Sequence, residues 1–285
     1  MSEQAAAGTP RTLVLGGGGI TGIAWEIGLL TGLASEGVDL TTADLVLGTS
    51  AGSVVGAQVT SGVPLDELFE AQVAGYGQEV AARMGVGLRL RFAGALLSTR
   101  DETRFRRKMG RLALRAKTMS EADRLAVIES RLPRHEWPDR DLRLTVVDAE
   151  SGELRVLDRT SGVPLVRAVA ASCAVPGVYP PIGIDGRRYV DGGVRSGTNA
   201  DLAAGSDRVV ILAPVARGVG PMLGVPAHLD LLRLTGRAVA VSPDETAVKA
   251  IGRNMLDPAQ RAAAARAGRA QAATARAEIA AIWAD

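Results

Sequence analysis

The sequence predicts an α/β protein with three layers, in which a largely parallel central sheet lies between helices (α/β/α). Three observations lead to this fold class. Short apolar runs at 12–15 and 45–47 are each followed by a glycine-containing turn and then by a segment with helical spacing. Strand, turn and helix in repeated succession are typical of parallel sheets, whose crossovers are helices. The chain has 285 residues, 47% of them hydrophobic, so it can bury a substantial core.

The first strand is expected at Thr12–Leu15, a short apolar run suited to a buried position. It leads into the glycine-rich loop Gly16–Gly22, after which apolar residues recur at helical spacing until about Gly37. In this arrangement, bare backbone N–H groups converge where a helix begins, which favours the binding of an anion or an oxyanion.

Three interpretations of the glycine loop compete. Three of its glycines satisfy the pattern of a dinucleotide site, but such a site needs an acid at the end of the second strand, where this chain has a glycine turn. A phosphate-binding P-loop is excluded, because Ile23 stands where that motif requires lysine. The third interpretation is an oxyanion hole made by N–H groups of the loop and of Ala51. It is the strongest of the three, because it uses both glycine motifs at once.

The second unit is Leu45–Leu47 followed by Gly48–Gly52, which has the pattern G-x-S-x-G, and then by small and apolar residues. This order is the context of a nucleophile elbow, in which a strand turns sharply into a helix and exposes a serine at the bend. Glycines on both sides of Ser50 leave room where a Cβ would collide with neighbouring elements. The pattern alone arises by chance in glycine-rich chains, but the strand and helix around it favour Ser50 as a nucleophile.

The middle of the chain is expected to hold a helix at Pro64–Ala74, an irregular segment at 75–99 and a basic amphipathic helix at 101–117. One stripe of the last helix is apolar and the other is basic: Phe105, Met109, Leu112 and Ala116 against Arg104, Lys108, Arg111 and Arg115, joined by Arg107. Such a helix can lie on an anionic lipid surface, although an ordinary surface helix explains the same pattern and is the simpler interpretation. We take 75–117 as a lid or insertion.

The remaining core elements are expected in the second half of the chain. They are a hairpin of strands at 142–148 and 153–157, a helix at 164–173, a strand at 187–191 and a last core strand at 208–213. The alanine-rich and arginine-rich segment at 258–283 is expected to be a surface helix. We therefore predict one domain over 1–285, with its core at about 12–213 and a helical C-terminal extension at 214–285.

A serine hydroxyl needs a base to accept its proton, and two kinds of base are open. His228, after the last expected core strand, is where a hydrolase histidine could fall, whereas His135 lies in a proline-flanked connector. Alternatively, Asp191 could act directly, since a strand end presents it with two glycines behind it that allow close approach to another loop. A local turn is the competing explanation for Asp191, as it is for the rival acid Asp148.

Several motifs, taken in their order along the chain, are similar to those of the patatin-like phospholipase family. The resemblance covers about 12–213, and ordered motifs are more specific together than any one alone. The residues that carry it are the loop from Gly16 through Gly17, Gly18 and Gly19 to Gly22, the elbow Gly48-Thr49-Ser50-Ala51-Gly52, the stretch Ala171–Pro176, and Asp191-Gly192-Gly193.

The resemblance implies hydrolysis of lipid acyl esters by a Ser–Asp dyad without histidine. Ser50 would be the nucleophile and Asp191 the base, and the N–H groups of Gly17–Gly19 would form the oxyanion hole. This chain departs from the family at Thr21, where the glycine loop usually carries Arg or Lys. The missing charge argues against a strong preference for phosphate-bearing lipids, though not against the acyl chemistry.

Composition excludes several other classes of function. The formal net charge of +2 shows no nucleic-acid signature, and one cysteine with two distant histidines builds no metal cluster, so we expect neither nucleic acid nor metal nor cofactor. No signal peptide or membrane-spanning stretch is recognised, so the expected location is the cytoplasm, with peripheral contact to anionic membrane through 101–117. The alternative hypotheses are a non-catalytic lipid- or partner-binding protein that retains the fold, and a dinucleotide-binding module.

Overall fold

The computed structural model describes residues 10–75, 87, 92, 94–96 and 98–283. Their strands form an eight-stranded mixed sheet in the order β5-β6-β3-β2-β1-β7-β8, with β4 paired to β3. The strands are β1 Arg11–Leu15, β2 Leu45–Gly48, β3 Asp141–Asp148, β4 Leu154–Leu157, β5 Ile182–Ile184, β6 Arg187–Asp191, β7 Arg208–Leu212 and β8 Arg237–Val241. The pairs β1–β2, β1–β7, β2–β3 and β7–β8 are parallel, whereas β3–β4, β3–β6 and β5–β6 are antiparallel. The predicted α/β class with a largely parallel sheet is confirmed.

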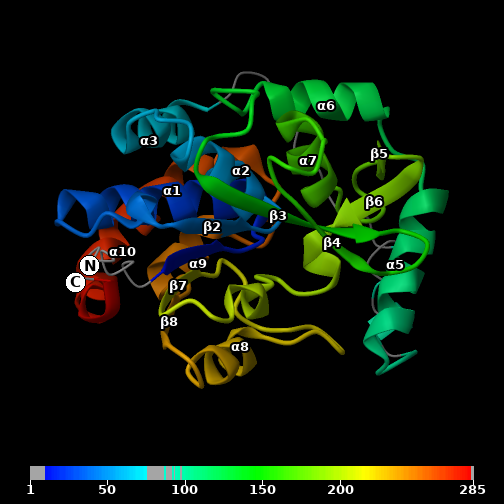
Figure 1. The fold of residues 1–285 in the computed structure, drawn as a ribbon. Coiled ribbons are helices and arrows are strands. Elements are labelled where there is room, and N and C mark those ends of the chain that lie inside the picture. Colours follow the sequence, from blue (N-terminus) through cyan, green and yellow to red (C-terminus); the bar gives the residue numbers. More distant parts are fainter. Residues whose placement is uncertain (1–9, 76–86, 88–91, 93, 97, 284–285) are drawn as a thin grey trace, which may run out of the picture.

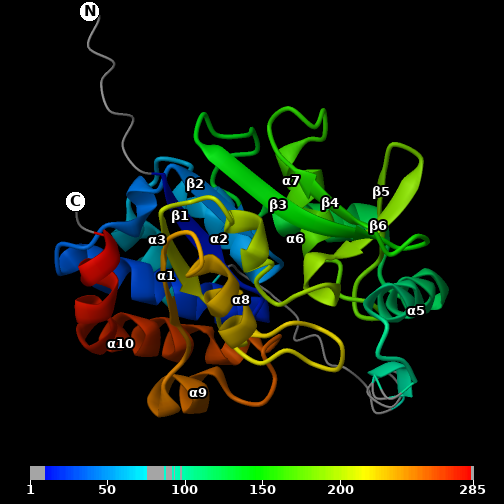
Figure 2. The ribbon, with the colours of Figure 1, turned by 60° about the horizontal axis from the view of Figure 1, so that its bottom comes forward.

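Helices cover both faces of this sheet (Figure 1). One face packs against α1 Gly19–Ser35, α2 Ala51–Val59, α7 Leu165–Ser172 and α10 Arg261–Trp283. The other face packs against α8 Val225–Leu232, the short 3₁₀ helix η3 Ala200–Ala203 and α5 Glu102–Arg115. Both views show α5 beside the end of the sheet formed by β5 and β6 (Figures 1 and 2). Because both faces are covered, the parallel strands are almost continuously apolar, which is why they were recognisable in the sequence.

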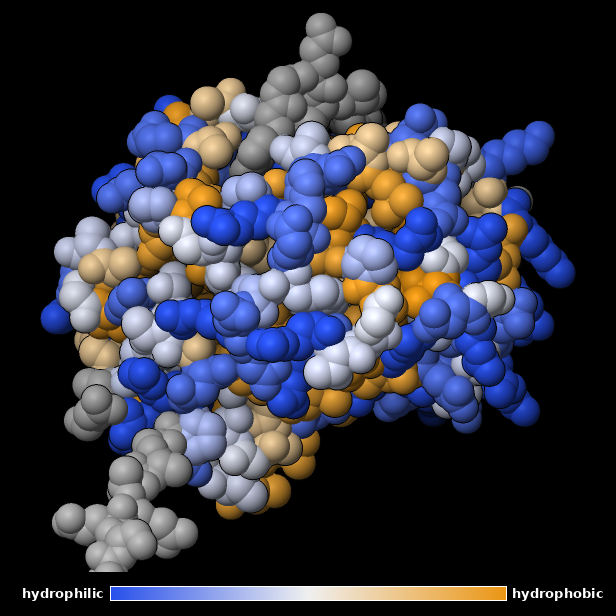
Figure 3. Space-filling view, turned by 45° about the horizontal axis from the view of Figure 1, so that its top comes forward, coloured by the Kyte–Doolittle hydropathy of each residue, from blue (hydrophilic) through white to orange (hydrophobic). Residues whose placement is uncertain are grey.

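The described part of the chain also contains the α-helices α3 Leu65–Ala74, α6 Glu121–Glu129 and α9 Glu245–Ile251 and the short 3₁₀ helices η1 Leu40–Thr42, η2 Gly192–Val194 and η4 Pro258–Gln260. The side of the molecule that carries α3 and α6 is covered mainly by hydrophilic side chains, with hydrophobic ones in separate patches (Figure 3). The predicted helices at 64–74, 101–117 and 164–173 are present within two residues of their expected ends. Most of the segment expected to be irregular, 75–99, lies outside the described residues, but residues 87, 92 and 94–96 are helical, so the expectation is wrong for them.

The prediction that 208–213 is the last core strand is wrong. Strand β8 pairs in parallel with β7 at the edge of the sheet, and α8 is the crossover between them. The expected C-terminal extension at 214–285 is therefore not purely helical. Alanine contributes little to strand propensity, so the five residues Arg-Ala-Val-Ala-Val carry a weak strand signal, and pairing with β7 decides their structure.

The C-terminal helix α10 is also more than a surface helix, because it packs along α1 with the two backbones in close approach. A Cβ on Gly28 would collide with the carbonyl oxygen of Ala265, and one on Gly268 would collide with that of Trp25. The indole Nε1 of Trp25 donates a hydrogen bond to Gln271 at 2.9 Å. The alanine-rich composition therefore forms a close helix–helix interface, and α10 supports the helix that begins at the glycine loop.

The register of the sheet brings the predicted motifs to one edge. Leu15 at the end of β1 pairs with Gly48 at the end of β2, so the glycine loop and the elbow begin side by side. On β3, Leu144 pairs with Gly48, and Val146, two residues further on, pairs with Asp191. Loops that follow the carboxyl ends of parallel strands are where ligand sites of α/β sheets are formed.

Candidate active site

Ser50 stands at a sharp turn between β2 and α2, with backbone angles φ 54° and ψ −116°. A non-glycine residue at positive φ is strained, and this conformation is the one that a nucleophile elbow imposes. A Cβ on Gly48 would lie 2.7 Å from the carbonyl oxygen of Gly52, and one on Gly52 would collide with Leu15. The flanking glycines are therefore required for the reason expected from the sequence.

The side chains of Ser50 and Asp191, 141 positions apart in the sequence, are in direct contact. The Ser50 hydroxyl donates a hydrogen bond to Oδ2 of Asp191 at 2.7 Å. The other carboxylate oxygen, Oδ1, accepts the backbone N–H of Gly193 at 2.7 Å. A Cβ on Gly192 would collide with Thr145 on β3, so this glycine allows the loop to pass close to the sheet. Serine and carboxylate thus have the geometry of a nucleophile with an adjacent base.

Burial makes Asp191 a stronger base than an exposed aspartate. It raises the pKa of the carboxyl group to about 6, while the hydrogen bonds from Ser50 and Gly193 and the charge of Arg124 act in the opposite direction. A general base works best when its pKa lies near the operating pH, because it is then largely ionised yet still has a useful affinity for a proton.

The backbone of Ser50 is held by residues at the end of α7. Its N–H donates to the hydroxyl of Ser172 at 3.0 Å, and its carbonyl oxygen accepts the Cys173 thiol at 3.1 Å. Ser53 donates to the same carbonyl at 2.6 Å. Cys173 is buried, as expected, and burial raises the pKa of its thiol. Ser172 and Cys173, in the stretch at 171–176, therefore hold the backbone of the elbow in place. The resemblance to the family included this stretch but gave it no role.

The glycine loop and the start of α2 present backbone N–H groups beside Ser50. Helix α1 begins at Gly19 and α2 at Ala51, and the first N–H groups of a helix have no acceptor within it. Gly18 packs against Pro214, and Gly19, at φ 61°, packs against Met255, so both positions require glycine. The N–H of Gly17, in contrast, donates to the carbonyl oxygen of Gly197 at 2.7 Å.

A cleft of about 340 Å³ opens above Ser50 and Asp191. Its walls are largely apolar and come from parts of the chain that are far apart in the sequence. They include Phe92, Leu96, Phe105, Met109, Val194, Val215, Val219, Met222 and Leu256. The segment expected to be a lid or insertion therefore supplies one wall. The apolar stripe of α5 faces the protein, because Phe105 and Met109 pack with Val147 and Val190.

Neither histidine contacts Ser50. His228 is buried and accepts the N–H of Asp201 at Nδ1, 3.1 Å away, so its Nε2 carries the proton and faces the Ser196 hydroxyl at 3.0 Å. Burial lowers the pKa of His228, which keeps the ring neutral. Although Ser196, His228 and Asp201 have the residue types of a triad, this tautomer cannot donate Nδ1–H to the carboxylate.

The other rivals considered from the sequence are explained by local structure. His135 is exposed and lies 3.6 Å from the carboxylate of Glu129. Asp148 accepts the N–H groups of Glu150 and Ser151 within its own turn and pairs with Arg187 at 3.0 Å. Their contacts are those of surface and turn residues.

A buried polar network that the sequence did not reveal ties the loops of the site together. Asn199, in a left-handed conformation with φ 50°, donates through its side-chain amide to the hydroxyls of Thr49 and Thr145 at 3.1 and 3.2 Å. The same amide lies 3.2 Å from the carbonyl oxygen of Gly192. The network links the elbow to the loop that carries Asp191. Asn199 and Thr145 lie outside any motif, so the sequence gave no signal of it.

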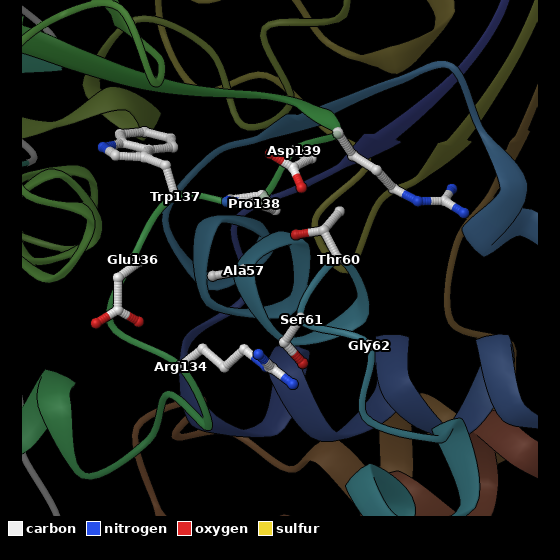
Figure 4. Close-up of a pocket in the computed structure, with 10 residues that line it drawn as sticks. Ala57, Thr60, Ser61, Gly62, Arg134, Glu136, Trp137, Pro138 and Asp139 are labelled. Atoms are coloured by element: carbon white, nitrogen blue, oxygen red, sulfur yellow. The ribbon is translucent and has the colours of Figure 1, made fainter.

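A larger hollow of about 530 Å³ lies at the end of α2 that is remote from Ser50. Figure 4 shows it between the turn that follows α2, with Thr60 and Ser61, and the connector from α6 to β3, with Arg134, Glu136 and Trp137. Its lining is polar and includes neither Ser50 nor Asp191. The presence of Ser50 and Asp191, rather than the volume of the cavity, therefore identifies the cleft above Ser50 as the candidate active site.

Comparison with known families gives the class of protein to which this fold belongs. The family model of patatin-like phospholipases matches residues 13–204, so the chain belongs to the patatin-like phospholipase family and is a hydrolase of carboxylic esters of lipids. The resemblance inferred from the motifs is confirmed. No curated protein sequence matches the chain.

Two solved structures are similar to the chain at low sequence identity. VipD from Legionella pneumophila has 16% identity and a TM-score of 0.46, over 96% of this chain and 69% of its own. The type III effector protein ExoU has 17% identity and a TM-score of 0.44, over 95% of this chain and 54% of its own. The chain thus spans about half the length of ExoU.

Proposed function

We propose that this chain cleaves acyl esters of lipids through a Ser–Asp dyad, with Ser50 as nucleophile and Asp191 as general base. The observation that carries the proposal is the 2.7 Å hydrogen bond from the Ser50 hydroxyl to a buried carboxylate at the floor of an apolar cleft. The strained elbow supports it, because strain at an isolated buried serine has no structural benefit.

In the first half-reaction, Ser50 Oγ attacks the carbonyl carbon of the ester while Asp191 Oδ2 takes the hydroxyl proton. The carbonyl oxygen becomes an oxyanion, and the N–H groups of Gly18, Gly19 and Ala51 stabilise it. Gly17 has a supporting role, because its N–H is already bonded to Gly197. The intermediate then collapses: the bond from carbon to the alcohol oxygen breaks, and Asp191 returns its proton to the leaving alcohol.

In the second half-reaction, water replaces the alcohol. Asp191 accepts a proton from the water as its oxygen attacks the acyl-enzyme, and the bond to Ser50 Oγ breaks with return of the proton to that oxygen. The products are a fatty acid and the regenerated serine. The apolar cleft suits an acyl chain, since burying it there removes apolar surface from water.

The proposal includes a cytoplasmic location with peripheral contact to an anionic membrane. Within the described part of the chain, no helix has the length and apolar character needed to cross a bilayer. Val215 and Val219 line the cleft and are 38% and 44% exposed, and Leu223 beside them is 50% exposed. These side chains suit contact with acyl chains, and the exposed arginines of α5, which forms one wall of the same cleft, suit anionic head groups.

The test is turnover of nitrophenyl esters by Ser50→Ala and Asp191→Asn variants. Each should lose activity on the order of a thousandfold or more, as is usual for members of a catalytic unit. Labelling by a fluorophosphonate should occur in the wild type and disappear in Ser50→Ala. If either variant turns over the esters at the wild-type rate, the residue replaced in it is not part of the mechanism. A folded wild type that neither labels nor turns over esters would favour the lipid-binding alternative.

A further inference from the structure

A second, smaller cavity adjoins Ser50 beside the apolar cleft. The two cavities share Gly19, Ser50, Val175 and Leu256 in their linings, so they meet at the nucleophile. The smaller one has a volume of about 20 Å³, enough for a group the size of a water molecule or a single oxygen atom. Unlike the apolar cleft, its lining includes two arginines, Arg124 and Arg131.

Arg124 comes from α6 and is only 2% exposed. One face of its guanidinium stacks on the ring of Tyr179, with 3.6 Å between the Cζ atom and the ring centroid. A terminal nitrogen lies 3.4 Å from the carbonyl oxygen of Cys173. Its Nε is also buried, and no acceptor among the described residues reaches it. Arg131, which follows α6 in the chain, is 7% exposed.

A buried cation with an unmet donor is costly unless something compensates it. Within the described residues, no carboxylate lies within ion-pair distance of Arg124, although the charge of Asp191 acts on it from further away. The charge of Arg124 is therefore only partly compensated, because Asp191 acts on it from a distance and also accepts the hydrogen bond of Ser50. An anionic group of the substrate could complete the compensation, because the small cavity adjoins both Ser50 and the buried guanidinium.

We propose that Arg124, with Arg131 beside it, forms an anion subsite that determines substrate specificity. The subsite takes an oxygen of a phosphate or carboxylate group carried by the alcohol portion of the ester, while the acyl chain lies in the apolar cleft. This inference rests on the proposed function and deepens it. The charge is supplied by α6 rather than by the glycine loop, where Thr21 is buried and makes its contacts with Met255.

The planar guanidinium suits this position better than an ammonium group would. Stacking on Tyr179 and bonding to Cys173 use one face and one corner of the group, and these contacts fix the orientation of the remaining donors. A lysine would keep the charge but lose the stacking and the fixed direction of its donors. Charge and geometry can therefore be separated by substitution.

The experiment compares esters that differ only in charge: 1-oleoylglycerol, 1-oleoylglycerol 3-phosphate, and an oleoyl ester of a short hydroxy acid. The wild type should prefer one or both anionic esters, and which one identifies phosphate or carboxylate as the ligand. At pH 8, where Asp191 should stay ionised without the charge of Arg124, Arg124→Gln should lower kcat/KM for the preferred ester by tenfold or more, mainly through KM. It should change kcat/KM for 1-oleoylglycerol less than threefold. Arg124→Lys should recover part of the preference. Arg134→Gln, at the hollow of Figure 4, is the matched control, and it should leave kcat/KM for the charged and the neutral esters unchanged.

Equal losses on charged and neutral esters would show a structural role for Arg124 and overturn the subsite. So would a wild type that hydrolyses all three esters equally well, an outcome that leaves the proposed hydrolase intact. Absence of turnover on every ester, with no fluorophosphonate labelling, would instead remove the proposed function itself.

If Arg124→Gln does not fold, inhibition of the wild type by butyl phosphate and butyrate tests the subsite instead. Competitive inhibition of 1-oleoylglycerol hydrolysis by either anion, but not by butanol, is expected, and no inhibition by either would contradict the subsite.

Discussion

At the scale of single residues, the proposed mechanism depends on a carboxylate that is buried away from water. Asp191 is 4% exposed and its pKa is raised to about 6, mainly by burial. A carboxylate with few compensating contacts is a poor choice for stability and a good one for proton transfer. Function and stability therefore make opposite demands on the same side chain.

The pH dependence of the reaction should report this pKa. Only ionised Asp191 can accept the Ser50 proton, so kcat/KM for a neutral ester should rise with pH and level off above about 6. Below that value it should fall about tenfold per pH unit. The measurement is a rate profile between about pH 4.5 and 8 with a neutral nitrophenyl ester. A midpoint near the ordinary aspartate value would show that burial does not govern the base.

The same shift predicts how stability depends on pH. The pKa of Asp191 is higher in the folded state, about 6, than in the unfolded state, 3.8. The stabilising contribution of this carboxyl group is therefore fully present below pH 3.8 and is lost as the pH rises through 6. Above 6 the ionised group destabilises the fold by about 3 kcal/mol, an order-of-magnitude figure from the size of the shift. Asp191→Asn should therefore melt at a higher temperature than the wild type at pH 8 and at a similar one near pH 4. Thermal melts at both pH values test this, and an Asn variant less stable at pH 8 would contradict it.

At the scale of elements, the position of the glycine loop depends on the packing of two helices, α1 and α10. Helix α1, which begins at the loop, packs backbone to backbone on α10 through Gly28 and Gly268. Beneath the loop, the carboxyl group of Glu26 accepts the N–H of Gly16 at 2.9 Å. Burial raises the pKa of Glu26 well above its ordinary value, which favours the neutral form of this carboxyl group.

Gly28→Ala should loosen the contact between α1 and α10. The new methyl group would collide with the backbone of Ala265, so α10 must shift, at a cost of roughly 1–3 kcal/mol. Because α1 carries the glycine loop, esterase activity should fall with stability. Denaturant unfolding and ester turnover measure both effects. Gly87→Ala, whose methyl would meet no atom of the other described residues within 4 Å, is the control, and equal behaviour of the two variants would show that the interface tolerates the methyl.

Sequence patterns revealed the elements that have strong local signals. The buried strands β1, β2, β3 and β7, the elbow and the Asp-Gly-Gly loop were all recognisable, because apolar runs that end in glycine turns have few alternative structures. Strand β8 was missed because its alanines have weak strand propensity and pairing with β7 decides its structure. Arg124 and Asn199 were missed because each is one polar residue outside any motif, and only the fold brings it to the site.

At the scale of the whole molecule, the cleft joins two kinds of surface. Exposed apolar residues of the loop at 215–223 lie at the cleft, and the basic residues of α5 lie beside it, whereas α10 lies on the opposite side of the molecule (Figures 1 and 2). The apolar stripe of α5 is buried against the protein, so this helix would meet a lipid surface mainly through its basic side chains. Membrane contact would then combine electrostatic attraction by α5 with shallow apolar contact by the loop.

The two contributions should separate by lipid composition. Replacing Arg104, Arg111 and Arg115 by Gln should weaken binding to vesicles with about a third of anionic lipid by roughly a hundredfold, since each basic residue near such a surface contributes about 1 kcal/mol. Binding to zwitterionic vesicles should not change. Val219→Ser with Leu223→Ser should weaken binding to both kinds of vesicle. Co-sedimentation of protein with vesicles measures each case.

The control removes the same charge elsewhere, by replacing the exposed Arg266, Arg269 and Arg276 of α10 with Gln. If binding depended only on net charge, both triple variants would lose affinity equally, and no orientation of the cleft towards lipid would follow. A selective loss in the α5 variant means that the membrane holds the molecule with the cleft facing the lipid. An acyl chain could then leave the bilayer and reach Ser50 without crossing water, which is the condition under which a cleft of this apolar character is useful.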